Sequence, residues 1–204
     1  RIDSTAGRYY AVDGMCFPSV TTILSCYPVS EGFKMWLANQ GGFAAAEKIK
    51  TDAGDRGSHV HHAIEELLSG DKLTHENFTT EEWKMLMSFV AWHREYKPQM
   101  IWKERTVYSK KHGYAGTADF CAKIDGEVYL LDWKTSKAIW PSHLLQVQAY
   151  AVALQEMKEP VQKLAVVRLG TKHKAGYEYK TFDIDAEEFQ VFLACKRLWE
   201  HEHP

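Results

Sequence analysis

Two aspartates and a lysine stand in neighbouring apolar segments of the chain. The segments read GTADFCA and VYLLDWKT, and they flank Asp125-Gly126, a pair typical of a tight turn between antiparallel strands. Side chains alternate along a strand, so Asp132 and Lys134 point to the same side with their Cα atoms about 7 Å apart. Asp119 lies on the partner strand at a similar distance from the turn. The hairpin therefore predicts two carboxylates and one ammonium group at a single place.

Two carboxylates at one place repel each other, and a hard divalent cation such as Mg²⁺ or Mn²⁺ between them removes that repulsion. A lysine beside such an ion could orient an attacking water or stabilise negative charge on a phosphorus centre. The exposed face of an ordinary hairpin also carries Asp, Lys and Thr. Here the neighbouring residues are strongly apolar, so the three side chains lie at the border between core and solvent. The spacing alone leaves both interpretations open.

The composition is that of a globular chain. The 204 residues are 45% hydrophobic and 25% charged, which fits one soluble domain over residues 1–204. No apolar run approaches the ~20 residues that a membrane span needs, and the opening RIDSTAGRYYAVDG lacks an apolar signal-peptide core. No two cysteines are close enough for a CxxC-type metal site, so we expect free thiols in a reducing, cytoplasmic compartment. The cysteines are Cys16, Cys26, Cys121 and Cys195.

The charge is unevenly distributed, although the net charge is only -2. Residues 97–140 contain eight Lys or Arg against five Asp or Glu, and residues 160–182 contain five against one. Acidic residues concentrate in 52–95 and 183–201. A molecule with such a basic face is compatible with phosphate binding. A mosaic of solvated charges is an equally open interpretation.

Alternating helix and strand patterns predict the elements that must position these residues. Their order predicts an α/β fold in which a central mixed β-sheet is flanked by α-helices. Pro141 favours a helix start, whereas Ser69-Gly70 and the residue before Pro98 favour helix ends. The expected elements are a hairpin at 8–26; helices at 31–50 (with an interruption at Gly41-Gly42), at 52–69, from Thr79 or Thr80 to just before Pro98, at 141–158 and at 186–200; and strands at 103–109, 115–124, 127–134, 163–169 and 176–183.

The hairpin residues resemble a known nuclease signature. Gly116-Thr117-Ala118-Asp119, followed by Asp132-Trp133-Lys134, is similar to the D…(D/E)-x-K motif of the PD-(D/E)XK nuclease superfamily. The sequence of these two segments is most similar to that of the RecB-like branch and of exonucleases of the mitochondrial genome maintenance type. Ala118 replaces the family's usual proline, which is a frequent variation in that branch. The resemblance covers roughly residues 8–185 and implies a restriction-endonuclease-like core.

A second motif of the RecB-like branch, Q-x-x-x-Y, falls on the helix that follows the hairpin. Gln146 and Tyr150 match it, and their i,i+4 spacing puts both on one helix face. A mostly apolar, buried helix could carry the two residues incidentally. In the family the pair lies near the active site and the DNA, so the resemblance implies the same role here.

The helix expected at 52–69 contains three histidines, and its periodicity selects one of them. Its apolar stripe consists of Val60, Ala63, Ile64, Leu67 and Leu68. At ~100° per residue, His61 lies on the edge of this stripe, while His59 and His62 fall on the far side. The RecB-like branch has a helix motif similar to R-G-(S/T)-x-x-H, whose histidine is a metal ligand. Residues 56–61 match that motif in register, so both arguments select His61.

Two other kinds of metal centre fit the sequence poorly. His59-Val60-His61 is an H-x-H, as in zinc hydrolases of the metallo-β-lactamase type, but Ala63 and Ile64 stand where their aspartate and final histidine would be. Some RecB-like nucleases hold an iron–sulfur cluster on one early cysteine and three grouped near the C-terminus. This chain has only Cys195 there, so we expect no iron–sulfur cluster.

Two further segments add to the resemblance. Glu104 lies in the strand before Asp119, where RecB-like nucleases often have an acidic residue that supports a metal or its water. An ordinary charge on an edge strand is the alternative for Glu104. The segment FPSVTTIL, followed by Trp36, resembles the opening of RecB-like exonucleases, where it packs near the active site.

The resemblance implies a divalent-metal-dependent deoxyribonuclease. Its catalytic residues would be Asp119, Asp132 and Lys134, and one or two Mg²⁺ or Mn²⁺ ions would be held by His61, Asp119, Asp132, Glu104 and the backbone carbonyl of Trp133. The expected DNA contacts are Gln146, Tyr150, Arg56, Ser58, Lys110, Lys111, Lys137 and Arg168. Tyr114 and Trp140 are candidates for stacking on unpaired bases.

A small domain with no obvious specificity module favours an exonuclease on single-stranded DNA ends, serving replication, recombination or repair in a phage or mobile element. Three alternatives stay open. The chain could be a catalytically silent nucleic-acid-binding module of the same fold, although a silent copy has no reason to keep the full Asp, Asp, Lys set. It could also be a structure-specific endonuclease, or a metallohydrolase that acts on a small ester and ignores DNA.

Overall fold

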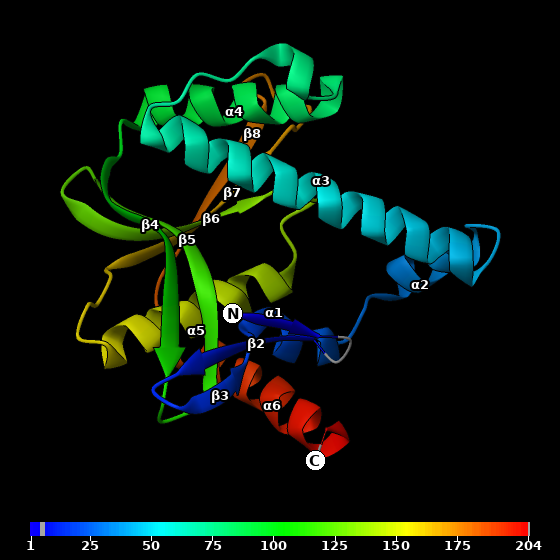
Figure 1. The fold of residues 1–204 in the computed structure, drawn as a ribbon, viewed down its shortest axis with the longest axis vertical. Helices are drawn as coiled ribbons and strands as arrows, with labels where there is room; N and C mark the ends of the chain where they lie inside the picture. Colours follow the sequence, from blue (N-terminus) through cyan, green and yellow to red (C-terminus); the bar gives the residue numbers. More distant parts are fainter. Residues whose placement is uncertain (5–6, 204) are drawn as a thin grey trace.

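The chain forms an α/β fold with a five-stranded mixed sheet flanked by helices. The structure is a computed structural model and describes residues 1–4 and 7–203. Figure 1 shows helices on both sides of the sheet. The predicted fold class is therefore confirmed.

The strand order of the central sheet is β4-β5-β6-β7-β8. Neighbouring strands are antiparallel except for β6 and β7, which are parallel. A parallel pair needs a crossover connection, and helix α5 supplies it. The strands are β4 (Gln99–Ser109), β5 (Tyr114–Ile124), β6 (Glu127–Lys134), β7 (Lys163–Leu169) and β8 (Tyr177–Phe182).

The two faces of the sheet are covered by different helices. α3 (Phe43–Ser69) and α4 (Thr80–Tyr96) cover one face, while α5 (Pro141–Glu156) and α6 (Ala186–Glu202) cover the other (Figure 1). On β6, Leu131 and Trp133 join the core under α3 and α4, and Leu130 joins the core under α5 and α6. Alternation therefore turns Asp132 and Lys134 towards α5.

A smaller three-stranded sheet precedes the central sheet in the chain. Its strands are β1 (Ile2–Ser4), β2 (Gly7–Val12) and β3 (Met15–Pro18), and they are followed by α1 (Val20–Ile23) and the 3-10 helix η1 (Leu24–Cys26). The expected hairpin at 8–26 is correct around its Asp13-Gly14 turn but too long. Val20 and Ile23 are fully buried, because a short helix turns both into the core under α5 and α6.

The helices between residues 31 and 69 divide at a different place from the one expected. α2 (Glu31–Ala38) ends before Gly41 and Gly42, whose φ angles of 74° and 123° are left-handed. α3 then continues without a break through residue 51. The interruption expected at Gly41-Gly42 is confirmed, because this pair separates α2 from α3. The boundary expected between residues 50 and 52 was wrong, because Thr51-Asp52 does not interrupt α3. The predicted stop at Ser69-Gly70 is confirmed by Gly70, whose φ is 93°.

The remaining elements lie close to their expected ranges, except that β4 begins at Gln99. A short 3-10 helix, η2 (His75–Asn77), links α3 to α4. In the part of the chain that the structure describes, no helix is both long enough and apolar enough to cross a membrane.

Candidate active site

Strands β5 and β6 separate at the position of the two aspartates. Their ladder runs from Ile124–Glu127 to Phe120–Leu131, and Asp119 and Asp132 are the next residues along each strand. The Asp119 carboxylate accepts a hydrogen bond from the backbone N–H of Trp133 at 2.8 Å. An antiparallel ladder would use a main-chain carbonyl there. A side chain thus replaces a backbone bond, and the hairpin opens where its acidic residues stand.

The opening forms part of a hollow with a volume of about 460 Å³. The residues that line it come from β5 and β6, from α3, from β2 and α1, and from β4 and α5. Asp119 is 8% exposed and Asp132 is 2% exposed, so both carboxyl groups are almost fully withdrawn from water. The hollow brings together Ser58, His61, Glu104, Asp119, Asp132, Lys134, Gln146 and Tyr150, all of which the sequence had suggested as site residues.

His61 reaches the hollow from α3. Its Nε2 lies 3.0 Å from the Trp133 carbonyl oxygen, and its Nδ1 lies 3.5 Å from Asp119 Oδ2. His59 instead binds Glu82 on α4 at 2.9 Å, and the exposed His62 lies 3.7 Å from Glu66. The three histidines therefore have different partners. His61 contacts the sheet, as the periodicity of the helix predicted, but His62 also lines the hollow.

A glycine allows α3 to approach the end of β6. A Cβ atom on Gly57 would lie only 3.2 Å from the Thr135 hydroxyl, which is tight for any larger residue. The glycine of the motif at residues 56–61 thus has a steric explanation. It lets the helix come close enough for His61 to reach the backbone of Trp133.

Glu104 stands in β4 opposite Asp119. The pairs Lys103–Phe120 and Arg105–Ala118 flank the two residues. Glu104 has a φ of 44°, a left-handed conformation that costs energy for a residue with a side chain and that often marks a functional site. Ligand atoms of His61, Glu104 and Asp119 lie within 4.8 Å of one another, so these three residues form a group that could hold a metal ion.

The carboxyl groups of the site lie close together and are partly or fully buried, and their pKa values are shifted from the ordinary ones. Burial and the nearby charge of Asp119 raise the pKa of Glu104 to about 7, although part of its side chain meets the solvent in the hollow. Burial also raises the pKa of Asp132, against the opposing charge of Lys134. For Asp119, burial acts upward too, but His61, Lys134 and the Trp133 N–H outweigh it and lower the pKa. Burial, the largest influence on all three pKa values, disfavours the ionised carboxylates, and a bound cation would favour them.

A hydrogen-bonded network on the α5 side connects Asp132 to Lys134. Lys134 Nζ lies 2.6 Å from Asp132 Oδ2 and donates to Gln146 Oε1 at 2.9 Å. The Gln146 amide in turn donates to Asp132 Oδ1 at 2.9 Å and to the Tyr150 hydroxyl at 3.2 Å. Gln146 thus binds both the Asp132 carboxylate and the Lys134 ammonium group. Sequence reasoning placed it at the site but did not find this bridging role, because helix spacing identifies a face and not its partners.

Tyr150 packs its ring against the backbone of β5. A Cβ atom on Gly116 would lie 2.5 Å from that ring, so only glycine fits at this position. The glycine that opens the GTAD motif therefore makes room for the tyrosine of the Q-x-x-x-Y motif.

The donor groups fit a hard divalent cation. The carboxylates and the Trp133 carbonyl are oxygen donors, and one imidazole adds a nitrogen donor, a set suited to Mg²⁺ or Mn²⁺. Oδ2 of Asp132 is buried and receives no hydrogen bond of acceptable geometry from any described residue, although Lys134 Nζ is near it. Asp132 lies outside the close group of His61, Glu104 and Asp119. Asp132 nevertheless lines the same hollow.

The two basic residues suggested after β4 lie at a distance from the hollow. Lys110 and Lys111 occupy the turn between β4 and β5. They are six or more residues along the chain from Glu104, which is roughly 20 Å of strand. Lys110 pairs there with Asp13 at 2.6 Å. The structure therefore does not bring these two lysines together with the carboxylates.

The other suggested phosphate contacts have partners within the protein. Arg56 Nη1 lies 3.3 Å from Glu81. Arg168 binds Glu178 at 2.8 Å and donates to the Lys137 carbonyl at 2.9 Å. Lys137 is exposed, and its Nζ lies 5.6 Å from the centre of the Trp36 ring. Sequence reasoning also missed Arg1 and Arg8, which line the hollow, because no local pattern brings the chain's first strands to a distant hairpin.

The prediction that Tyr114 stacks on unpaired bases was wrong. Its side chain is fully buried, and its hydroxyl donates to the Ala149 carbonyl at 2.8 Å. The ring packs edge-on against Phe192 of α6, so it belongs to the core. Trp140, at the start of α5, is 46% exposed and has a ring that a ligand can reach.

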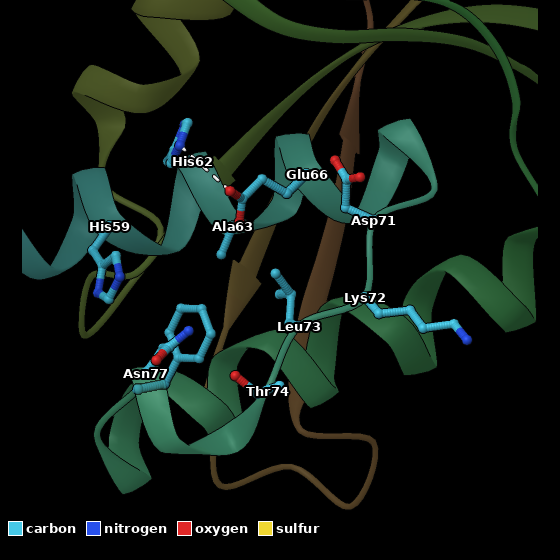
Figure 2. A pocket seen from close by; sticks show the side chains of 10 residues that line it. His59, His62, Ala63, Glu66, Asp71, Lys72, Leu73, Thr74 and Asn77 are labelled. Carbon is cyan, nitrogen blue, oxygen red and sulfur yellow. Dashed lines mark ion pairs between the residues drawn. The ribbon is translucent and has the colours of Figure 1, made fainter.

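A second hollow of about 400 Å³ lies between the C-terminal part of α3 and the segment that contains η2. Figure 2 shows His59, His62 and Glu66 on the helix, with Thr74 and Asn77 on the segment that faces it. Asp119, Asp132 and Lys134 do not line it. We therefore place the candidate chemistry in the first hollow.

Comparison with known proteins supports the fold. No protein-family model matches the sequence, and neither does any curated protein. The structure of LHK-Exo in complex with dAMP matches with a TM-score of 0.50 and 9% sequence identity, over 91% of this chain and 87% of that one. A structure of the alkaline exonuclease LHK-Exo from Laribacter hongkongensis gives 0.49 at 9% identity, with the same coverage. SSO0001 gives 0.42 at 12% identity, over 85% of this chain and 69% of that one. At such identities the likeness to LHK-Exo establishes a shared fold.

Proposed function

We propose that this chain is a divalent-metal-dependent deoxyribonuclease with a PD-(D/E)XK active site and that it removes nucleotides from DNA ends. The observation that carries the proposal is the meeting of Asp119, Asp132 and Lys134 with His61 in one hollow. These residues come from α3, β5 and β6. Crowded carboxylates can hold an ion that activates water and polarises a phosphate, and a lysine beside them can stabilise the charge that develops.

The roles follow from the contacts of each side chain. A divalent ion held by His61, Glu104 and Asp119, with Asp132 and the Trp133 carbonyl beside it, would lower the pKa of a bound water and polarise the scissile phosphate. Lys134 would donate a hydrogen bond to the attacking water or to a phosphate oxygen, and so stabilise charge that develops there. Gln146 keeps the ammonium group oriented, because its Oε1 accepts a hydrogen bond from Lys134.

The reaction adds one water across a phosphodiester. The water oxygen forms a bond to phosphorus, and the bond from phosphorus to one sugar oxygen breaks. A proton lost by the water is balanced by a proton gained by the departing sugar oxygen. The products are a strand with a hydroxyl end and one with a phosphate end.

Two observations favour an exonuclease over an endonuclease. The hollow, at about 460 Å³, has the size of a small-ligand site and could hold a terminal nucleotide. LHK-Exo, which shares the fold, was crystallised with dAMP. Arg1 and Arg8 line the hollow. Both pair with the single carboxylate of Asp3, so together they keep an excess positive charge that would favour the phosphates of a single-stranded end.

We further propose that residues 1–204 act as one nuclease domain in a reducing, cytoplasmic compartment. In the described part of the chain all four cysteines are free, which suits such a compartment. A role in replication, recombination or repair, in a phage or mobile element, fits an enzyme that acts on DNA ends.

A gel assay tests the proposed activity. The substrates are end-labelled single-stranded and double-stranded DNA, linear and circular, in Mg²⁺, Mn²⁺ or EDTA. We expect metal-dependent loss of linear DNA by the wild-type protein. Asp132→Ala and Lys134→Ala should lower the rate at least ~100-fold, because each removes a group that stabilises the transition state, while DNA binding persists. Lys123→Ala is the matched control, since Lys123 is an exposed lysine on β5.

The possible results separate the alternatives. Cleavage of circular DNA would favour the endonuclease. Binding without cleavage in any metal would point to the catalytically silent module. Neither binding nor cleavage would mean that the carboxylates serve another substrate, and the nuclease proposal would be abandoned.

A further inference from the structure

Helix α2 exposes aromatic side chains that the protein core does not use. All of its residues are described, and none is buried. Phe33 is 40% exposed and Met35 is 66% exposed, while the rings of Phe33 and Trp36 stack with their centres 5.6 Å apart at 26°. The helix is nevertheless well formed, because the Ser30 hydroxyl caps it by accepting from the Phe33 N–H at 3.2 Å. A capped helix that keeps an aromatic stack in solvent is suited to binding flat ligands.

The aromatic stack is connected to the strand that carries Lys134. Lys137 Nζ lies 5.6 Å from the centre of the Trp36 ring, a cation–π distance. The Lys137 carbonyl accepts a hydrogen bond from Arg168, which is the register partner of Lys134 on β7. Glu178 holds the same guanidinium group from β8 at 2.8 Å. These contacts therefore connect α2 to the end of the strand that carries Lys134.

The stack also lies close to the hollow along the chain. Thr135 lines the hollow, and Lys137 is two residues further on, at most about 7 Å away along the backbone. Figure 1 shows α2 beside the N-terminal end of α3, apart from the central sheet. Ala53 and Gly54 of that same half of α3 line the hollow. The wall of the hollow thus continues towards α2.

We propose that Phe33 and Trp36 form a stacking platform for unpaired bases of the DNA strand that enters the hollow. This inference rests on the proposed nuclease function and names the form of its substrate. Aromatic rings bind bases through their flat faces, which are free only in unpaired nucleic acid. Lys137 supplies a cation for the backbone between the platform and the site. A paired duplex hides its base faces, so the platform selects a single strand or a frayed end.

Binding to an oligothymidylate of about 12 nucleotides, a length within the usual range of such sites, tests the platform. Fluorescence anisotropy in EDTA measures affinity without cleavage. We expect Trp36→Ala and Phe33→Ala to weaken binding roughly 5- to 100-fold, the range for a lost base stack. Trp36→Phe should restore most of the affinity, because it keeps a ring. An oligothymidylate of about 3 nucleotides should bind all variants alike, since it fills the hollow without reaching α2.

Met35→Ala is the matched control, because Met35 is the most exposed large hydrophobic residue of α2 and lies outside the Phe33–Trp36 stack. Its affinity should equal that of the wild type. Unchanged affinity in Trp36→Ala and Phe33→Ala would overturn the platform while leaving the nuclease intact, as would an equal loss with Met35→Ala. Wild-type protein that binds the oligothymidylate but cleaves no DNA would refute the nuclease and keep the platform. Wild-type protein that binds no single-stranded DNA would overturn both.

Discussion

At the scale of single residues, the site depends on buried polar groups whose partners come from another element. Asp132 is 2% exposed and Gln146 is 8% exposed, so each hydrogen bond between them is shielded from water. A buried group that loses its partner pays the full cost of its desolvation. The amide of Gln146 therefore stabilises the fold and orients Lys134 at the same time, and these two effects can be separated by experiment.

Gln146→Met keeps the size of the side chain and removes its amide. We expect the free energy of unfolding to fall by about 1–3 kcal/mol, because Asp132 Oδ1 loses its donor. We also expect DNA cleavage to fall at least ~10-fold, as Lys134 loses the acceptor that orients it. Urea denaturation and initial cleavage rates measure the two effects.

The control lies on the same helix. Gln148 is equally buried, and it binds the Asp183 carbonyl at 2.8 Å and the Asp185 N–H at 3.0 Å, away from the hollow. Gln148→Met should cost similar stability and leave the cleavage rate of the folded protein unchanged. If Gln146→Met lost stability but kept full activity, the positioning role of Gln146 would be refuted.

At the scale of elements, the sequence predicts what is local and misses what is distant. The strands that carry Asp119 and Asp132 were predicted well, because an apolar alternation and the Asp125-Gly126 turn lie within one short segment. Both turn residues have left-handed φ angles, 49° and 93°, as the pair predicts. Tyr114 was misjudged because its position in the strand does not tell which face α6 will cover. The link from Lys137 to α2 joins segments about a hundred residues apart, which no local pattern encodes.

Helix α4 offers a prediction about pH. Its Thr79–Glu82 capping box is extended by His59 of α3, which lies 2.9 Å from Glu82. Burial acts to raise the pKa of Glu82, but hydrogen bonds from Thr79 and His59 outweigh it and bring the pKa below its ordinary 4.5. A lowered pKa in the folded state means that the ionised Glu82 contributes stability above pH 4.5, and that this contribution is lost as the pH falls through the folded pKa.

Glu82→Gln should therefore have a lower free energy of unfolding than the wild type at neutral pH. Its free energy of unfolding should also fall less steeply as the pH becomes acidic. We expect the gap to the wild type to be about 1 kcal/mol near neutrality and to close below pH 4.5. The measurement is the free energy of unfolding as a function of pH. Glu81→Gln serves as the reference, because Glu81 is an exposed neighbour with a side chain 62% exposed, and its curve should run parallel to that of the wild type. A gap that stays constant with pH would contradict the predicted role of Glu82.

At the scale of the whole molecule, the candidate ligands come from four separate elements. His61 lies on α3, Glu104 on β4, Asp119 on β5 and Asp132 on β6. Such groups meet only in the folded chain, so an ion that binds them binds the native state alone. Metal binding must then raise the stability of the entire fold. The crowded carboxylates also predict that the metal-free protein is less stable, because without an ion their mutual repulsion opposes folding.

Thermal unfolding in EDTA and in Mn²⁺ tests both statements. Saturation at about 100 times Kd adds about 2.7 kcal/mol, which corresponds to a rise in Tm of roughly 5–10 °C for a chain of this size. Glu104→Gln removes one crowded carboxylate, so it should unfold at a higher temperature than the wild type in EDTA and gain less from Mn²⁺. Glu66 also lies on α3 but does not line the hollow that contains Asp119. Glu66→Gln should therefore have the same Tm as the wild type in EDTA and in Mn²⁺. If Mn²⁺ left the Tm of the wild type unchanged, no ion would bind where these four elements meet. The same conclusion would follow if Mn²⁺ raised the Tm of Glu104→Gln and of Asp119→Asn as much as that of the wild type.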